Sequence, residues 1–262
     1  MTISRIIGCI SAKGGVGKTT SSINLAAALN YFGKSVTLVD ANLTTPNVGI
    51  YLGFPVPTST LHDSIRGKKD VKDVIIEHKS GVKIVPGSIS LKDAKKSDHA
   101  KLSSILRELD GHTDFMVVDS APGISKEALS VLHAVHEVII ITNPEMPAVT
   151  DALKTVRLCK ELRKDVIGVL VTKTNAKNVD MSIKSIEDIL EIPVIGVIPE
   201  DRAVKYALAS KEAVVHSHPR SAAAVQYKRL AADLLNLKYS ERIEMAENTI
   251  FDDILIWLGF KD

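Results

Sequence analysis

The feature that most constrains the fold is a series of short apolar runs, rich in β-branched residues, that alternate with longer helix-like stretches. The runs lie at 5–10, 35–40, 82–87, 114–119, 137–142, 166–172 and 193–198. Most of them are apolar at successive positions, which predicts strands that are covered on both faces. Helix-like stretches occur between them, for example at 19–32, 101–109, 148–162 and 179–190. The alternation predicts an α/β fold, with a mostly parallel, twisted sheet and helices on both faces.

The loops that follow the strands are where a ligand is expected, because right-handed crossovers bring the carboxyl ends of parallel strands to one edge of the sheet. Three informative loops follow strands: SAKGGVGKTT after 5–10, ANLTTPN after 35–40 and SAPG after 114–119. Residues 42–80 are the least regular part of the body. We expect them to form a lobe that packs on the edge of the sheet.

The loop at 11–20 has the composition of a phosphate-binding loop. Its glycines leave backbone N–H groups free to converge on phosphate oxygens, and a helix that begins near Lys18 adds its positive N-terminal end. Lys18 is expected to reach the β- and γ-phosphates, and the hydroxyl of Thr19 is expected to bind Mg²⁺. The predicted nucleotide-binding segment comprises Gly14, Gly15, Val16, Gly17, Lys18, Thr19 and Thr20.

A second lysine, Lys13, precedes the glycines, although Lys18 already matches the phosphates. The pattern K-G-G-x-G-K-[ST] resembles the signature of the deviant-Walker ATPases, the MinD/ParA/nitrogenase iron-protein family. The sequence TNPE at 142–145 resembles the MinD branch, and the resemblance covers about residues 3–235.

This resemblance implies a P-loop NTPase fold, ATP and Mg²⁺ as cofactors, and a homodimer that forms on ATP binding. In the family, the first lysine reaches the nucleotide of the other subunit. Lys13 would therefore be a catalytic residue in trans, as an arginine finger is, where such a charge changes the rate by about 10³–10⁵.

Two aspartates end strands beside the phosphate loop. Asp119 precedes SAPG, which resembles the family's second switch, so Asp119 would hold the Mg²⁺ shell and Gly123 would offer a backbone N–H to the γ-phosphate. Asp40 opens DANLTTPN, which resembles the first switch, usually hhhD-x-D, so Asp40 would organise the metal shell and the switches together with Asp119 as a catalytic residue. The second aspartate of this switch is Asn42 here, and Asn42 is a predicted nucleotide-site residue. An amide can hydrogen-bond a water molecule but cannot accept its proton. We therefore expect slow ATP hydrolysis and a long-lived ATP-bound dimer.

Two late loops, VLVTKTN at 169–175 and VIPED at 197–201, follow strands where this family contacts adenine. By resemblance, Thr172, Pro199 and Glu200 are the predicted contacts to the base.

The C-terminal segment differs from the body in charge. Residues 241–262 have a net charge of −4, whereas the whole chain carries +2. As a helix, residues 250–260 would present a broad apolar face with Phe251, Trp257 and Phe260. MinD proteins carry a membrane-targeting helix here, but such helices are normally basic. The sequence leaves open whether the tail contacts a membrane, binds a protein or docks on the body, and we divide the chain into an ATPase domain at 1–238 and an acidic amphipathic tail at 239–262.

The cysteines, the apolar runs and the net charge exclude several classes of protein. Cys9 and Cys159 form no C-x-x-C pair, which argues against zinc, iron–sulfur and redox sites, and free thiols fit a reducing compartment. The apolar run after Arg5 is too short for a signal peptide, and no stretch is long enough to span a bilayer. We therefore expect a cytoplasmic protein, with peripheral membrane contact through the tail as an open alternative. The small net charge makes nucleic acid an unexpected partner.

The function that fits these features is an ATP-dependent dimerising positioning switch of the MinD type, which would regulate a cell-division site or another cellular position. Two alternatives remain: a non-hydrolysing adaptor that binds ATP as a structural ligand, and a ParA-type DNA-segregation ATPase. The sequence does not identify the protein partner or the cargo.

Overall fold

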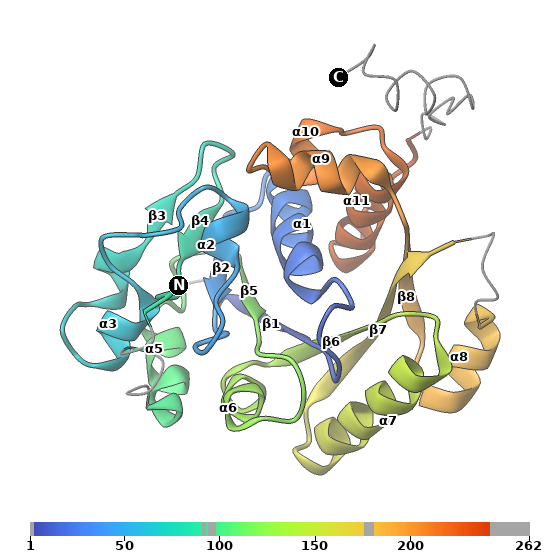
Figure 1. The fold of residues 1–262 in the computed structure, drawn as a ribbon, viewed down its shortest axis with the longest axis horizontal. Helices are drawn as coiled ribbons and strands as arrows, with labels where there is room; N and C mark the ends of the chain where they lie inside the picture. Colours follow the sequence, from blue (N-terminus) through green and yellow to red (C-terminus); the bar gives the residue numbers. More distant parts are fainter. Residues whose placement is uncertain (1–2, 91–92, 94–97, 176–180, 242–262) are drawn as a thin grey trace.

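The computed structural model describes residues 3–90, 93, 98–175 and 181–241, and these residues contain one eight-stranded sheet with the order β3-β4-β2-β5-β1-β6-β7-β8 (Figure 1). Only β3 is antiparallel to its neighbour. The predicted α/β fold is confirmed. The strands are β1 (Arg5–Ile10), β2 (Val36–Asp40), β3 (Ile76–Glu77), β4 (Lys83–Val85), β5 (Phe115–Asp119), β6 (Glu137–Thr142), β7 (Asp165–Thr174) and β8 (Val194–Pro199).

Helices cover both faces of the sheet (Figure 1). One face packs against α1 (Lys18–Tyr31), α9 (Arg202–Ala209), α10 (Val214–Ser217) and α11 (Ala222–Leu234). The other face packs against α5 (Leu102–Glu108), α6 (Lys126–Ala134), α7 (Met146–Glu161) and α8 (Ile183–Leu190). None of the helices in the described part of the chain is long and apolar enough to cross a bilayer.

The central strands are apolar at successive positions because both of their faces are buried. In β1, Ile7 belongs to the cluster beneath α1 and α11, whereas Ile6 and Ile10 belong to the cluster on the α6 and α7 side. Fully burying an aliphatic side chain of this size contributes about 1.5–3 kcal/mol. Polar side chains are therefore found mainly at the ends of these strands. Because the strands are parallel, their carboxyl ends bring these polar groups together along one edge of the sheet.

The irregular region after β2 contains short elements: α2 (Val48–Tyr51), α3 (Leu61–Ile65), the 3₁₀ turn η1 (Val71–Val74) and β3. A second 3₁₀ turn, η2 (His99–Lys101), precedes α5. The strand β3 pairs with β4 and so extends the edge of the sheet. A capping box between Thr60 and Asp63 starts α3, which is the reason a helix of only five residues forms there.

Parallel register brings the functional loops together. Asp119 at the end of β5 lies opposite Cys9 in β1 and opposite Asp40 in β2. The loops after β1, β2 and β5 consequently leave the sheet at the same level. The predicted amphipathic helix at 250–260 lies outside the described residues.

Candidate nucleotide-binding site

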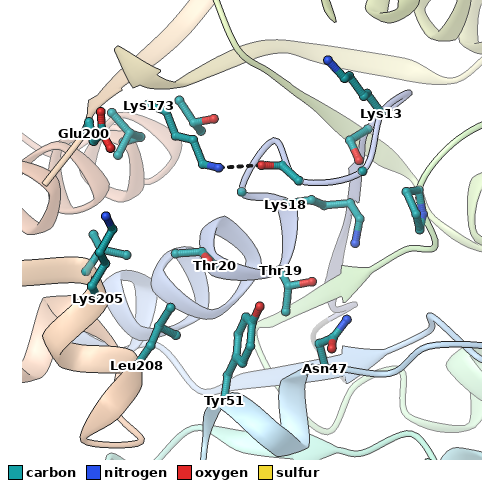
Figure 2. Close-up of a pocket in the computed structure, with 18 of the residues that line it drawn as sticks. Lys13, Lys18, Thr19, Thr20, Asn47, Tyr51, Lys173, Glu200, Lys205 and Leu208 are labelled. Carbon is teal, nitrogen blue, oxygen red and sulfur yellow. Dashed lines mark hydrogen bonds between the residues drawn. The ribbon is translucent and has the colours of Figure 1, made fainter. Parts of the chain in front are cut away.

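A cavity of about 570 Å³ opens at the carboxyl edge of the sheet, over the N-terminus of α1 (Figure 2). Most of the residues predicted to bind nucleotide line it. They are Lys13, Gly14, Gly15, Gly17, Lys18, Thr19, Thr20, Asn42, Thr172, Pro199 and Glu200. Four predicted residues lie elsewhere: Val16 is in the core, Asp40 and Asp119 are buried, and the Gly123 N–H donates to the Ser11 carbonyl at 2.8 Å.

The loop between β1 and α1 has its N–H groups available for an anion. Gly15 and Gly17 adopt φ values of 80° and 87°, which L side chains rarely adopt, so glycine is required for this path. Gly17 is also the N-cap residue of α1, and no side chain caps that helix. An uncapped helix N-terminus with converging N–H groups is a binding site for phosphate.

The end of β7 holds the phosphate loop in this shape. The Lys173 Nζ atom donates to the Gly15 carbonyl at 2.7 Å (Figure 2). The Thr172 hydroxyl contacts the Val16 carbonyl and also donates to the Thr142 carbonyl. The contacts to Gly15 and Val16 engage carbonyl groups of the phosphate loop, so the N–H groups of the loop are left for a ligand. The base contact predicted for Thr172 stays a prediction, since its hydroxyl is engaged with the loop.

Lys18, Thr19 and Asp119 form one buried cluster. Asp119 is fully buried, and its Oδ1 accepts from Lys18 Nζ at 2.8 Å while its Oδ2 accepts from the Thr19 hydroxyl at 2.7 Å. The Ser22 hydroxyl donates a third bond to Asp119, also at 2.8 Å. The groups predicted to bind phosphate and Mg²⁺ are therefore assembled on one carboxylate.

Asp40 lies beneath the cavity and fastens the start of α2. It accepts the backbone N–H of Val48 at 3.0 Å and that of Asn42 at 3.3 Å. Burial, together with the negative charge of Asp119, raises the pKa of Asp40 to about 8. Near neutral pH its carboxyl is therefore mainly protonated in this state.

The side chain of Asn42 is folded into its own loop. Its Nδ2 donates to the Thr45 carbonyl at 2.6 Å. Its Oδ1 accepts from both the N–H and the hydroxyl of Thr45, each at 3.2 Å. The amide thus makes the turn that an Asx side chain characteristically makes, and this leaves it one N–H for any other partner.

Lys13 differs from Lys18 in direction. Lys13 lines the rim of the cavity, and Figure 2 shows its side chain pointing away from the Lys18 side chain. The Lys13 Nζ atom lies 3.9 Å from Glu145 at the start of α7, and both side chains are about half exposed, at 49% and 59%. Exposed pairs of this kind contribute little, so Lys13 is free to exchange partners.

Sequence reasoning missed several residues that line the cavity. Asn47 and Tyr51 come from the α2 region, Lys205 and Leu208 come from α9, and Lys173 comes from β7. Two of them were within reach, because Lys173 and Asn47 lie in loops that the family resemblance singled out. Tyr51, Lys205 and Leu208 belong to elements that only the tertiary fold brings to the site. Pro199 and Glu200, at the end of β8, complete the same wall, where the Glu200 N–H donates to the Thr174 carbonyl at 2.9 Å.

A glycine-rich loop from the central strand into an uncapped helix, with a lysine, a threonine and an aspartate beside it, defines a P-loop nucleotide-binding protein. A family model described as ParA, the NUBPL iron-transfer P-loop NTPase, matches residues 2–235. An uncharacterized ATP-binding protein of Methanocaldococcus jannaschii is 35% identical over 249 residues, which cover 95% of this chain and 94% of the relative.

Two further proteins resemble the chain along most of its length. The antiactivator FleN of Pseudomonas aeruginosa is 33% identical over 238 residues, 87% of this chain and 85% of FleN. The septum site-determining protein MinD of Pyrococcus horikoshii, solved in complex with Mg-ADP, matches with a TM-score of 0.85 and 31% identity, over 88% of this chain and 96% of MinD.

The chain belongs to the MinD/ParA family of P-loop ATPases and lies close to the MinD branch. Its cofactors are ATP and Mg²⁺. The donors fit them, since the Thr19 and Asp119 oxygens are the hard ligands that Mg²⁺ prefers. Cys9 and Cys159 are buried in different clusters on opposite faces of the sheet, so they cannot ligate one iron centre within the chain.

Proposed function

We propose that the protein is an ATP-dependent dimerising switch that regulates the position of a cellular component, such as the cell-division site. The names of its relatives support a regulator, since one is an antiactivator and another determines the septum site. The observation that carries the proposal is Lys13. Its side chain diverges from that of Lys18 and is about half exposed, which supports a role toward a second subunit.

In the ATP-bound dimer, Lys18 and the N–H groups of the loop bind the β- and γ-phosphates. Thr19 and Asp119 would hold Mg²⁺, which would neutralise charge on the phosphate chain. Because Lys18 donates to Asp119 in this structure, it has to leave the carboxylate to reach the phosphates. Lys13 of the second subunit adds positive charge where negative charge develops in the transition state.

Hydrolysis is slow in this proposal because of Asn42. The amide can orient the attacking water through an N–H or through its oxygen, but it cannot accept the proton of that water. Its oxygen and one N–H are also engaged with Thr45. The proton must therefore pass to another acceptor, for example an oxygen of the γ-phosphate.

The test is phosphate release from Mg-ATP, measured as specific activity against protein concentration. Specific activity should climb with concentration, because a catalytic group comes from the second subunit, and Lys13→Ala should lower it by about 10³ or more. Lys154→Ala is the matched control, since Lys154 is an exposed lysine on α7 that pairs with Asp151 and does not line the cavity. Activity that is independent of concentration and survives Lys13→Ala would refute the role in trans.

Asn42 also favours a second candidate, a non-hydrolysing adaptor in which ATP only holds the dimer together. Absent phosphate release, with Mg-ATP bound and the dimer formed, would support this adaptor. A DNA-segregation ATPase would instead show a salt-sensitive shift of DNA in a gel, because such binding rests on phosphate contacts.

The tail is part of the same proposal as the segment through which the dimer acts. Membrane contact is tested against the other two roles by flotation of the ATP-bound protein with anionic vesicles and by the same assay with phosphatidylcholine vesicles. Flotation with both vesicle types would support apolar insertion of residues 250–260, and flotation with neither would leave a protein contact or docking on the body.

A further inference from the structure

The first switch loop is fastened to a helix that follows the second switch. The Thr44 hydroxyl donates to Oε1 of Glu127 in the first turn of α6. That turn is itself fixed, because the N-cap residue Ser125 accepts the N–H of Ala128 at 3.2 Å. Gly123 of the second switch precedes Glu127 by four residues. One side-chain contact therefore connects the first switch loop with the helix that begins just after the second switch.

Glu127 is unusual for a carboxylate on a helix. Its side chain is only 8% exposed, and its second oxygen, Oε2, is buried without a hydrogen-bond partner among the described residues. A buried oxygen without a partner costs free energy. Thr44, by contrast, is exposed, so it covers the carboxylate from the solvent side. A fold does not retain such a carboxylate for stability alone.

The contact acts on the loop that contains Asn42. Thr44 lies inside the turn that Asn42 closes on Thr45. To orient a water molecule with its oxygen, Asn42 has to release at least one of the two bonds that this oxygen accepts from Thr45, and this loosens the turn. The bond from Thr44 to Glu127 holds the middle of the turn against α6 and so resists that opening.

We infer that Glu127 is a positioning residue that acts through Thr44 as a brake on ATP hydrolysis. It keeps the first switch loop folded with Asn42 engaged on Thr45. When the bond is broken, Asn42 is released toward the cavity that it lines. This inference rests on the proposed ATPase function, and it assigns part of the slow turnover to a contact outside the phosphate loop.

The test uses Thr44→Val, Glu127→Ala and the double variant in the full chain. Each single variant should raise the turnover number about ten- to one-hundred-fold, the change in population expected when one hydrogen bond to a carboxylate is removed. The dissociation constant for Mg-ATP should change less than about two-fold, because neither residue lines the cavity. The double variant should be no faster than the single variants, since both remove the same bond.

Matched controls are Thr150→Val and Glu108→Ala, an exposed threonine on α7 and an exposed glutamate on α5. Turnover that is unchanged or lower in Thr44→Val and Glu127→Ala, or effects that simply add, would overturn the brake while leaving the ATPase proposal standing. If the wild type releases no phosphate but Thr44→Val does, the brake is upheld. If none of the proteins releases phosphate although all bind Mg-ATP, both proposals fall.

Discussion

At the scale of single residues, Asp40 shows how the fold alters a group that the sequence identifies correctly. Its position in the first switch predicts a charged carboxylate that organises the metal shell. In this structure it lies fully buried beneath the cavity and accepts two backbone N–H groups. Those bonds favour the charged form, but burial and the charge of Asp119 outweigh them and raise the pKa of Asp40 to about 8. Asp40 therefore keeps its proton to a higher pH than an exposed aspartate does.

This proton predicts a pH dependence of stability. An aspartate titrates near pH 4 in the unfolded chain, so between about pH 4 and pH 8 the folded protein binds one proton more than the unfolded protein. The free energy of unfolding of the ligand-free protein should consequently fall as the pH rises through this range. In Asp40→Asn a neutral amide replaces the protonated acid. Between pH 6 and pH 8.5 the free energy of unfolding should therefore fall by about 1–3 kcal/mol less in this variant than in the wild type.

Urea unfolding monitored by circular dichroism at both pH values gives the comparison directly. The difference between the two proteins is the informative quantity, because other titrating groups contribute equally to both. Equal losses of stability in wild type and Asp40→Asn would contradict the raised pKa.

At the scale of elements, the phosphate loop depends on a strand that is distant in the sequence. Lys173 adopts φ 56°, a left-handed conformation that is uncommon outside glycine. This conformation turns its ammonium group back over the loop to the Gly15 carbonyl. Strain of this kind persists where surrounding contacts enforce it, and such residues cluster at binding sites.

We therefore expect Lys173→Met to weaken the binding of ADP and of ATP to a similar extent, by about three- to ten-fold. The substitution removes preorganisation of the loop and no contact to the γ-phosphate. Isothermal titration calorimetry with each nucleotide measures this. Lys160→Met is the control, since Lys160 is an exposed lysine that pairs with Glu191. A defect confined to ATP would show that Lys173 contacts the third phosphate instead.

The elements also show what sequence reasoning could reach. Lys18, Thr19 and Asp119 were predictable because a contiguous motif and a strand end each fix a residue by local rules. The strand β3 was missed because two residues cannot show a periodicity. The helix α2 was missed for a similar reason, since a turn of four residues is stabilised by its surroundings. Tyr51 belongs to α2, and the Thr44 contact to Glu127 joins residues 83 positions apart, so no local pattern could have indicated either of them.

At the scale of the whole molecule, helix α1 connects the nucleotide site with the root of the tail. It begins at Lys18 and ends at Tyr31, a length of about 21 Å. Beyond its far end, Lys228 is fully buried and forms an ion pair with Glu241. Its ammonium lies 4.8 Å from the centroid of the Tyr31 ring and 5.7 Å from that of Tyr239. Residues 239–241 therefore pack against the body, although the sequence placed them in the tail.

This packing predicts where the stable domain ends. A chain that stops at residue 238 loses Tyr239 and Glu241 and leaves the Lys228 ammonium buried without its counter-ion, which is more costly than the absence of the pair. We expect it to be about 1–3 kcal/mol less stable than the full chain. A chain that stops at residue 241 keeps the pair and should be more stable than the chain that stops at residue 238 by about this amount. Urea unfolding of the three proteins decides the boundary, because equal stability of the two shortened chains would place it at residue 238 and would leave the Lys228 pair without a role in the fold.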